Sequence, residues 1–298
     1  MLDNVNKSTV IALGYFDSVH LGHQKLIKSA KEYADANGCT LTVFTFKGNL
    51  KAMLGLEQDK CVYLAKERQL LLKELGADEI YFAPISKTFL ATGKLAFLNK
   101  LNKKYNIKAY FTGDDYTFGA FGKGNIEYLT EYAKSHNQKH VIVDTFTYMQ
   151  DKVSTTLVKK ALVKGDIKGA NALLGRNYSI TSKVIKDRKV GTKIGFPTAN
   201  LLIENDKIQL KEGVYAGKIK VLDKEYLAII NYGARPTFDL NEKLVEAHLI
   251  DFNGNLYGKT LTIVFKNFIR DIIKFDSVEG LVNQLKIDLQ SVKDGKYD

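Results

Sequence analysis

Two histidines, His20 and His23, follow a short apolar run and open a long amphipathic pattern. Their spacing of three residues places both imidazoles on the same turn of a helix. Gly14 and Gly22 lie in the same stretch, where glycine lets the backbone approach a phosphate and a helix N-terminus offers N–H groups. Imidazoles and amides suit an α-phosphate that gains charge during nucleophilic attack, so both histidines are candidate catalytic residues. The alternative is an ordinary polar strand-to-helix turn.

A second chemical pattern lies in the segment 191–200, which reads GTKIGFPTAN. Pro197 fixes φ, and on an extended strand Thr198 and Asn200 point to the same face because they are two residues apart. A hydroxyl and an amide carbonyl are suitable oxygen ligands for a Mg²⁺ that bridges nucleotide phosphates. The segment therefore predicts a magnesium–nucleotide site with Thr198 and Asn200 as metal ligands.

A candidate base follows in the segment 245–251, where apolar and polar residues alternate and place Glu246 and His248 on one face of a strand. A carboxylate near magnesium ATP can take the proton from an attacking primary hydroxyl. The alternative is a glutamate that only faces solvent. Upstream, the basic stretch 186–191 is either a lid over the phosphates or a solvated surface turn.

The elements that must position these residues change in character along the chain. Up to about residue 145, five β-rich runs alternate with helical patterns, which predicts a parallel α/β sheet with ligands beyond the carboxyl ends of its strands. A helical connector over 154–175 ends at Gly175. Five strand patterns without crossover helices and one closing helix then predict an antiparallel sheet or small barrel. We expect two domains, 1–165 and 175–298.

The bulk composition of the 298 residues is that of a globular protein, with 45% hydrophobic and 26% charged residues. No apolar run reaches bilayer length and no signal peptide is visible, so we expect a cytoplasmic protein with no membrane partner. Cys39 and Cys61 lack CxxC spacing, which favours packing over a metal or disulfide role. The net charge of +11 suits nucleic acid or small phosphorylated anions. The lysines are spread out and no nucleic-acid motif appears, so no nucleic-acid partner is expected.

The stretch GYFDSVHLGH resembles the HxGH nucleotidyltransferase superfamily, and specifically the adenylyltransferase domain of bacterial bifunctional riboflavin kinase/FAD synthetases. The segments TGDDYTFG (112–119) and VSTTLVK (153–159) are similar to later motifs of that domain. The resemblance implies nucleotide contacts from Gly14, Phe16, Asp17, Gly22, Ser154, Thr155, Thr156 and Lys159. It implies flavin contacts from Gly113, Asp115 and Phe118.

Three departures from this family pattern fall in the N-terminal half. Ser18 replaces the usual glycine, Lys159 replaces an arginine, and the second strand ends in TFKGN in place of a histidine-proline pair. Arginine grips a phosphate in a bidentate manner, whereas lysine supplies a point charge. We therefore expect the adenylyl transfer to be the slower of two reactions.

The segment GFPTAN closely resembles the riboflavin kinase signature, and further matching pieces extend from 213 to 275. The resemblance implies nucleotide contacts from Gly191, Gly195 and Pro197, and Glu246 as the catalytic base. Arg270 is expected on the flavin side. Around 182–187 the loop departs from the family pattern, which leaves its contacts open.

The resemblance covers nearly the entire chain. It implies a Rossmann-like α/β domain with a parallel sheet, followed by a C-terminal antiparallel β-barrel with a closing helix. The implied reactions are the phosphorylation of riboflavin to FMN and the adenylylation of FMN to FAD, with ATP and Mg²⁺ in each. Riboflavin, FMN and ATP are the expected partners. Whether the chain forms a homo-oligomer is left open by the sequence. The alternatives are a riboflavin kinase with a degenerate transferase half, and a basic RNA-binding or regulatory flavin-sensing protein.

Overall fold

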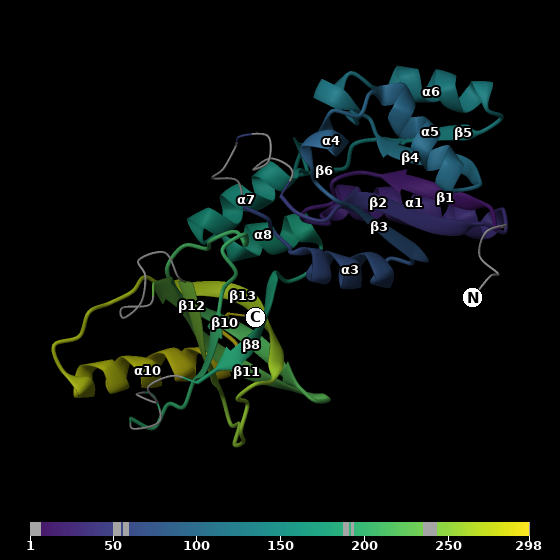
Figure 1. Ribbon diagram of the computed structural model, residues 1–298. Helices are drawn as coiled ribbons and strands as arrows, with labels where there is room; N and C mark the ends of the chain where they lie inside the picture. The colour runs from purple at the N-terminus through teal and green to yellow at the C-terminus, as the bar shows by residue number, and fades with distance from the viewer. Residues whose placement is uncertain are drawn as a thin grey trace. The chain divides into compact units, whose positions relative to one another are not determined.

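The structure is a computed structural model that describes residues 7–49, 55, 60–186, 191, 194–234 and 243–297. The chain divides into two compact units, residues 1–155 and residues 156–298 (Figure 1). Among the described residues, no helix combines the length and the hydropathy that a membrane crossing requires.

The first unit is built on five parallel strands in the order β3-β2-β1-β4-β5. Their bounds are β1 Thr9–Leu13, β2 Thr40–Phe46, β3 Glu79–Ala83, β4 Ile107–Gly113 and β5 Lys139–Val143. The strand order reverses at the β1–β4 pair, and ligands of such sheets bind at this point, beyond the carboxyl ends of the strands. The predicted parallel sheet is confirmed.

Helices cover both faces of this sheet. The bounds are α1 Leu21–Ala36, α3 Ala65–Glu74, α4 Lys87–Leu90, α5 Lys94–Lys104, the 3₁₀ helix η1 Ala120–Gly122 and α6 Ile126–Ser135. One core joins α1 and α3 to the sheet through Leu26 and Leu72, and a second core joins α5 and α6 to the other face through Leu98 and Leu129. Strand β1 is buried along its whole length, as the apolar run after Thr9 requires, and the Thr9 hydroxyl pairs with that of Thr42.

A short hairpin follows β5 and was not predicted. Its strands are β6 Thr147–Tyr148 and β7 Asp151–Lys152. The turn between them is formed by Met149 and Gln150, with φ values of 49° and 72°. Hairpin turns of this kind usually carry glycine or asparagine, so the sequence lacks the ordinary signal.

His140 of β5 is held between two threonine hydroxyls, with Nε2 at 2.9 Å from Thr112 Oγ1 and Nδ1 at 2.7 Å from Thr130 Oγ1. Burial lowers the pKa of His140 from 6.5 to about 4. Between these values the unfolded chain binds a proton that the folded chain does not bind. The stability that neutral His140 contributes is therefore complete above pH 6.5, and it is lost progressively as the pH falls from 6.5 through about 4.

We expect this group to lower the free energy of unfolding of the first unit by about 1 kcal/mol between pH 7 and pH 5, allowing for its partial exposure. Urea unfolding of the wild type and of His140→Gln at the two pH values measures the effect. The variant should lose less stability on acidification. Equal losses in the two proteins would show that His140 does not carry this pH dependence.

Two helices follow, α7 Thr155–Lys164 and α8 Ile167–Leu174, and all their residues after Thr155 belong to the second unit. The predicted connector is one helical region, and the structure breaks it at Gly165, where Asp166 caps α8 by accepting a hydrogen bond from Gly169 N at 2.9 Å. The predicted end at Gly175 is confirmed, because this residue has a φ of 64° and closes α8 in the left-handed conformation.

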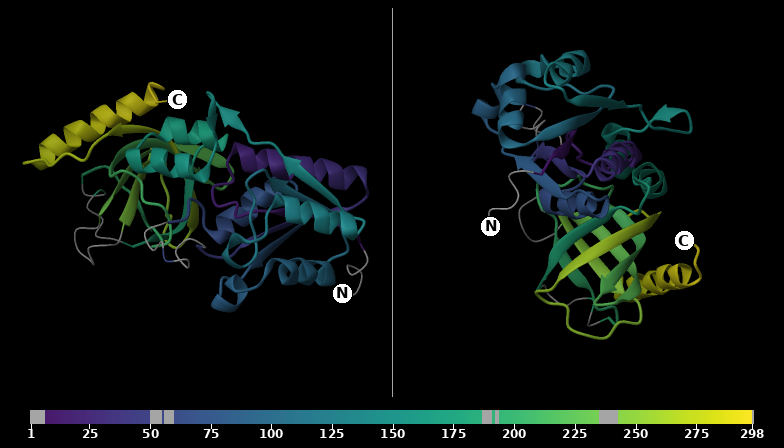
Figure 2. Two further views of the ribbon diagram at one scale, coloured as in Figure 1. Left: turned by 90° about the horizontal axis from the view of Figure 1, so that it is seen from above. Right: turned by 90° about the vertical axis from the view of Figure 1, so that its right-hand side faces the viewer.

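A closed barrel follows, with the strand order β10-β11-β12-β9-β8-β13 and every neighbouring pair antiparallel (Figure 2). The bounds are β8 Ser179–Ile185, β9 Ala199–Leu202, β10 Gly213–Val221, β11 Lys224–Ala234, β12 Lys243–Leu249 and β13 Thr260–Arg270. The predicted barrel is confirmed. Its sixth strand, β9, is absent from the five predicted runs because it has only four residues.

The closing helix, α10 Val278–Lys293, packs on the outer face of the barrel. Its Val292 shares a buried cluster with Val214 of β10 and Ile229 of β11. The helix therefore covers the part of the outer barrel face on which Ile229 lies.

Candidate active sites

The first site begins where β1 passes into α1. His20 is the N-cap of α1, and its Nδ1 accepts a hydrogen bond from the backbone N–H of His23 at 3.2 Å. The ring proton of neutral His20 therefore sits on Nε2. The rings of His20 and His23 stack with their centroids 3.7 Å apart. The two predicted imidazoles thus form a stacked pair at a helix N-terminus, where N–H groups and the helix dipole favour an anion.

Gly14 and Gly22 make room for this arrangement. A Cβ on Gly22 would lie 3.1 Å from Cε1 of His20, so a side chain there would press the imidazole away from its capping position. A Cβ on Gly14 would lie 2.6 Å from the ring of Phe16. Phe16 itself is buried and has a φ of 48°. The glycine spacing of the motif therefore has a steric cause beside the chemical one.

Asp17 and Ser18 anchor the same loop. Asp17 is fully buried, and its Oδ1 accepts a hydrogen bond from the Val62 amide at 2.9 Å. The described pocket wall does not include Asp17, so its contact with the nucleotide stays a prediction. The Ser18 hydroxyl lies 2.9 Å from that of Thr155. Ser18, which stands where the family has a glycine, thus links the loop to the segment after β7 through a hydrogen bond.

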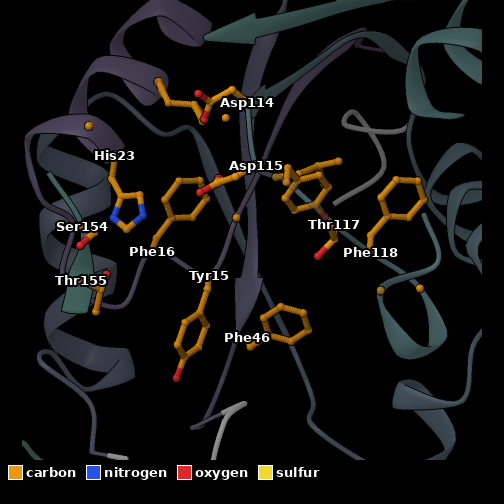
Figure 3. Close-up of a pocket in the computed structure, with 18 of the residues that line it drawn as sticks. Tyr15, Phe16, His23, Phe46, Asp114, Asp115, Thr117, Phe118, Ser154 and Thr155 are labelled. Carbon is orange, nitrogen blue, oxygen red and sulfur yellow. The ribbon is translucent and has the colours of Figure 1, made fainter. Parts of the chain in front are cut away.

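A pocket of about 820 Å³ opens beyond the carboxyl ends of β1 and β4, where the strand order reverses (Figure 3). Its polar part is formed by Gly14, Gly22, His20, His23, Ser154 and Thr155. Its aromatic part is formed by Phe46, Phe89, Phe97, Tyr116, Phe118 and Phe121. In Figure 3, His23 and Ser154 lie on one side and Phe118 lies on the opposite side. The pocket is therefore polar at one end and aromatic at the other.

The aromatic end is a packed series of rings. Phe97 and Phe118 have centroids 5.6 Å apart, and Tyr116 stacks on Phe118 at 5.8 Å. Phe46 and Phe89 meet edge to face at 5.8 Å, and Phe89 meets Phe97 in the same way at 6.3 Å. Such walls suit a flat heteroaromatic ligand. The predicted residues Gly113, Asp115 and Phe118 all line this pocket.

Two aspartates and one lysine form ion pairs at the rim of the pocket. Asp115 pairs with Lys152 of β7 at 2.8 Å, and Asp114 accepts a hydrogen bond from Thr145 at 2.7 Å. The hydrogen bond from Thr145 and the nearby Lys152 charge lower the pKa of Asp114. The hydrogen bond to Asp115 raises the pKa of Lys152. Lys152 therefore stays cationic at the rim, and the sequence did not predict it because it lies on the unexpected hairpin.

Arg68 of α3 supports the pocket from behind. Its side chain is almost fully buried and donates hydrogen bonds to Tyr15 O at 3.1 Å and to Phe46 O at 2.8 Å. Both acceptors belong to residues that line the pocket. Sequence reasoning missed Arg68, since an arginine in an amphipathic helix usually faces solvent.

Two further residues predicted to bind the nucleotide, Thr156 and Lys159, lie on α7 in the second unit. The described wall of the pocket extends along the chain as far as Thr155. The nucleotide roles of Thr156 and Lys159 stay predictions.

The second site is a row of three polar residues on three adjacent strands of the barrel, β9, β12 and β11. Glu246 of β12 lies directly opposite Asn200 of β9 and, on its other side, opposite Asn231 of β11. Residues opposite one another in antiparallel strands project to the same face, with Cβ atoms about 5 Å apart. The structure therefore brings Glu246 and Asn200 together and adds Asn231, which the prediction did not include.

Asn200 offers an oxygen that suits a metal ion. The residue is only 7% exposed, and its Oδ1 is buried and accepts no hydrogen bond from the described part of the chain. A buried carbonyl oxygen in this condition is stabilised by a cation or a donor from a ligand. Thr198 lies two residues earlier, directly before β9, and an extended chain would turn both side chains to one face.

The segment before β9 is fixed in place by two contacts. Gly191 O accepts a hydrogen bond from Phe196 N at 2.8 Å, which closes a turn that contains Gly195. His248, two residues beyond Glu246 on the same face, has Nδ1 at 2.9 Å from Pro197 O. His248 therefore holds the segment that carries Thr198 beside the strand that carries the predicted base. Residues 187–190 of the predicted basic lid lie outside the described residues.

Arg270 lies at the end of β13 and pairs with Asp288 of α10, with Nη2 at 2.7 Å from Oδ2. A second bond runs from Nε to the same carboxylate oxygen at 3.1 Å, and Gln284 also donates to Asp288. This partly buried pair joins the closing helix to the barrel. The flavin contact expected of Arg270 stays a prediction.

Comparison with known proteins gives two matching family models. A family described as FAD synthetase matches residues 2–157, and a family described as riboflavin kinase matches residues 174–295. A curated bifunctional riboflavin kinase/FMN adenylyltransferase from Listeria monocytogenes is 34% identical, over 97% of this chain and 92% of its own length. Its counterpart from Bacillus subtilis is 33% identical, over 95% and 90%. A solved structure from Streptococcus pneumoniae, described as a macrolide-efflux protein, has a TM-score of 0.88 at 32% identity and covers 97% of this chain and 94% of that one.

Proposed function

Because the chain belongs to the family of bifunctional riboflavin kinases/FMN adenylyltransferases, we infer that it makes FAD from riboflavin in two ATP-dependent steps. The first step transfers the γ-phosphoryl group of ATP to the 5′-hydroxyl of riboflavin and releases ADP. The second step transfers AMP to FMN and releases pyrophosphate. The observation that carries this inference is a pair of different sites, one in each unit, that suit the two different transfers.

The pocket of the first unit suits the adenylyl transfer. A phosphate oxygen of FMN attacks the α-phosphorus of ATP, a new P–O–P bond forms, and the bond to pyrophosphate breaks. His23 and the amides at the start of α1 stabilise the charge that develops on the α-phosphate. The Ser154 and Thr155 hydroxyls hold the phosphates at the same end, and the aromatic end takes the flavin ring.

The row in the second unit suits the kinase step. Glu246 takes the proton of the 5′-hydroxyl while its oxygen attacks the γ-phosphorus and ADP leaves. Thr198 and Asn200 would hold Mg²⁺, which neutralises charge on the phosphates when it is bound, and the orphaned Asn200 oxygen fits that role. The backbone turn at Gly191 and Gly195, followed by Pro197, lies beside this position and is assigned to the nucleotide.

Chromatography of riboflavin incubated with Mg·ATP and the pure chain tests the proposal. FMN should appear first and FAD should follow, because the departures at Ser18 and Lys159 fall in the transferase half. FMN without any FAD would leave the kinase alone. No flavin product at all would overturn both assignments.

Ser18→Ala is expected to lower kcat/KM for FAD formation from FMN by about fivefold, since one hydrogen bond contributes about 1 kcal/mol. The Thr155 hydroxyl that lines the pocket loses its tie to the loop. Steady-state assays of both half-reactions measure the effect, and FMN formation should not change. Ser135→Ala, on an exposed helix end of the same unit, is the control. An unchanged FAD rate in Ser18→Ala would show that this tie has no part in the transfer.

A further inference from the structure

Asn231 has no part in the two steps as described, although it lies directly opposite the proposed base. Its Oδ1 is buried and accepts no hydrogen bond within the described residues. An amide oxygen in this condition destabilises the folded protein unless a donor reaches it. Asn200, at the other end of the row, shows the same feature and is assigned to the metal. Asn231 therefore needs a donor that the protein does not supply in its described part.

The row has a phosphate side and a side away from the phosphates. Asn200 is the proposed ligand of the Mg²⁺ that would neutralise the phosphates, and it lies at one end of the row, between Glu246 of β12 and Ile185 of β8. The phosphates therefore lie on the Asn200 side of Glu246. Asn231 lies on the opposite side, where the alcohol that loses its proton to Glu246 must enter.

The surroundings of Asn231 suit a polyol joined to an apolar ring. Neighbouring strands are about 4.8 Å apart, so a chain whose terminal hydroxyl is at Glu246 places its next hydroxyls near Asn231. Two residues earlier on the same face, Ile229 packs with Val292 of α10. Along this face, the proposed base is therefore followed by an amide oxygen and then by the apolar cluster that contains Ile229 and Val292. Riboflavin presents a terminal hydroxyl, secondary hydroxyls and then its ring in the same order.

We propose that Asn231 Oδ1 accepts a hydrogen bond from a secondary hydroxyl of the ribityl chain and thereby selects flavins with a hydroxylated side chain. Asn231 is then a specificity residue of the kinase step. The assignment rests on the proposed kinase function of this site and on Glu246 as its base.

The test compares riboflavin with a flavin that carries a 5-hydroxypentyl chain, which keeps the terminal hydroxyl and lacks the secondary hydroxyls. Asn231→Ala in the full chain should lower kcat/KM for riboflavin by about tenfold, as expected for one lost hydrogen bond. For the hydroxypentyl flavin the same substitution should change kcat/KM by less than about twofold. Asn267→Ala, an amide of the barrel strand β13, which does not pair with β11, should change neither value.

Equal losses on both flavins would overturn the proposal, since a structural defect or a metal ligand affects both alike. A raised Mg²⁺ requirement in Asn231→Ala would assign the residue to the metal instead. If the alanine variant does not fold, Asn231→Ser is assayed in the same way, and it too must discriminate between the two flavins. Failure of the wild type to phosphorylate riboflavin would refute the kinase function itself, which is a separate outcome.

Discussion

Glu246→Gln should lower FMN formation from riboflavin by at least about 100-fold, because general-base catalysis contributes on this scale. Glutamine keeps the size of the side chain and its place between Asn200 and Asn231, yet it cannot accept the proton of the 5′-hydroxyl. The loss should appear in kcat as well as in kcat/KM, since the proton is transferred only as the reaction proceeds.

The second reaction supplies an internal control for this prediction. FAD formation from supplied FMN takes place in the pocket of the first unit and should change by less than about twofold in Glu246→Gln. Glu225→Gln, at the exposed β10–β11 turn, is the matched substitution elsewhere in the barrel. A kinase rate in Glu246→Gln within about threefold of the wild type would remove this carboxylate from the mechanism.

The features that the sequence predicts well are local ones. The His20–His23 turn follows one strand directly, so the residues that form it are close together in the chain, and a period of 3.6 marks the helix they begin. The same holds for Thr198 and Asn200, whose two-residue spacing on an extended segment places them on one face. The structure confirms the strand, helix and barrel patterns that carry these residues.

The features that the sequence does not predict depend on pairing between distant segments. Asn231 becomes part of a site only because β11 and β12 pair in a register that places it opposite Glu246. A shift of one residue would turn it to the other face, and a single strand pattern does not specify that register. Asp288 is a similar case, because it reads as a polar residue of an amphipathic helix until it meets Arg270.

Apart from Phe118, the rings at the aromatic end of the first pocket were missed for a different reason. Phe46 ends a buried strand and Phe97 lies on the apolar stripe of α5, so both match the pattern of an ordinary core. Whether such a ring faces a core or a cavity depends on what lies opposite, and here the opposite wall comes from the segment after β4. Hydrophobic periodicity reports burial and does not distinguish these two outcomes.

The second large effect is expected for His23→Ala, which should lower FAD formation from FMN by about 100- to 1,000-fold, the loss typical of a group that stabilises transition-state charge. FMN formation should be unaffected, so riboflavin and ATP should yield FMN that persists. His23 lines the pocket, and its ring stacks on His20, whose Nδ1 is committed to the α1 cap. Of the two imidazoles, His23 is therefore the one whose removal leaves the cap acceptor in place.

The comparison of His23→Ala with His23→Gln separates charge stabilisation from simple packing. Glutamine returns an N–H donor without an aromatic ring, so it should recover at least about tenfold of the lost rate if the donor acts on the α-phosphate. If the ring matters only because it packs on His20 at 3.7 Å and on Phe16 at 5.2 Å, glutamine should be no better than alanine. His136→Ala, at the end of α6 in the same unit, controls for the loss of a histidine as such. FAD formed at the normal rate by His23→Ala would exclude this side chain from the transfer and would leave the amides of α1 and the hydroxyls of Ser154 and Thr155 to stabilise the charge.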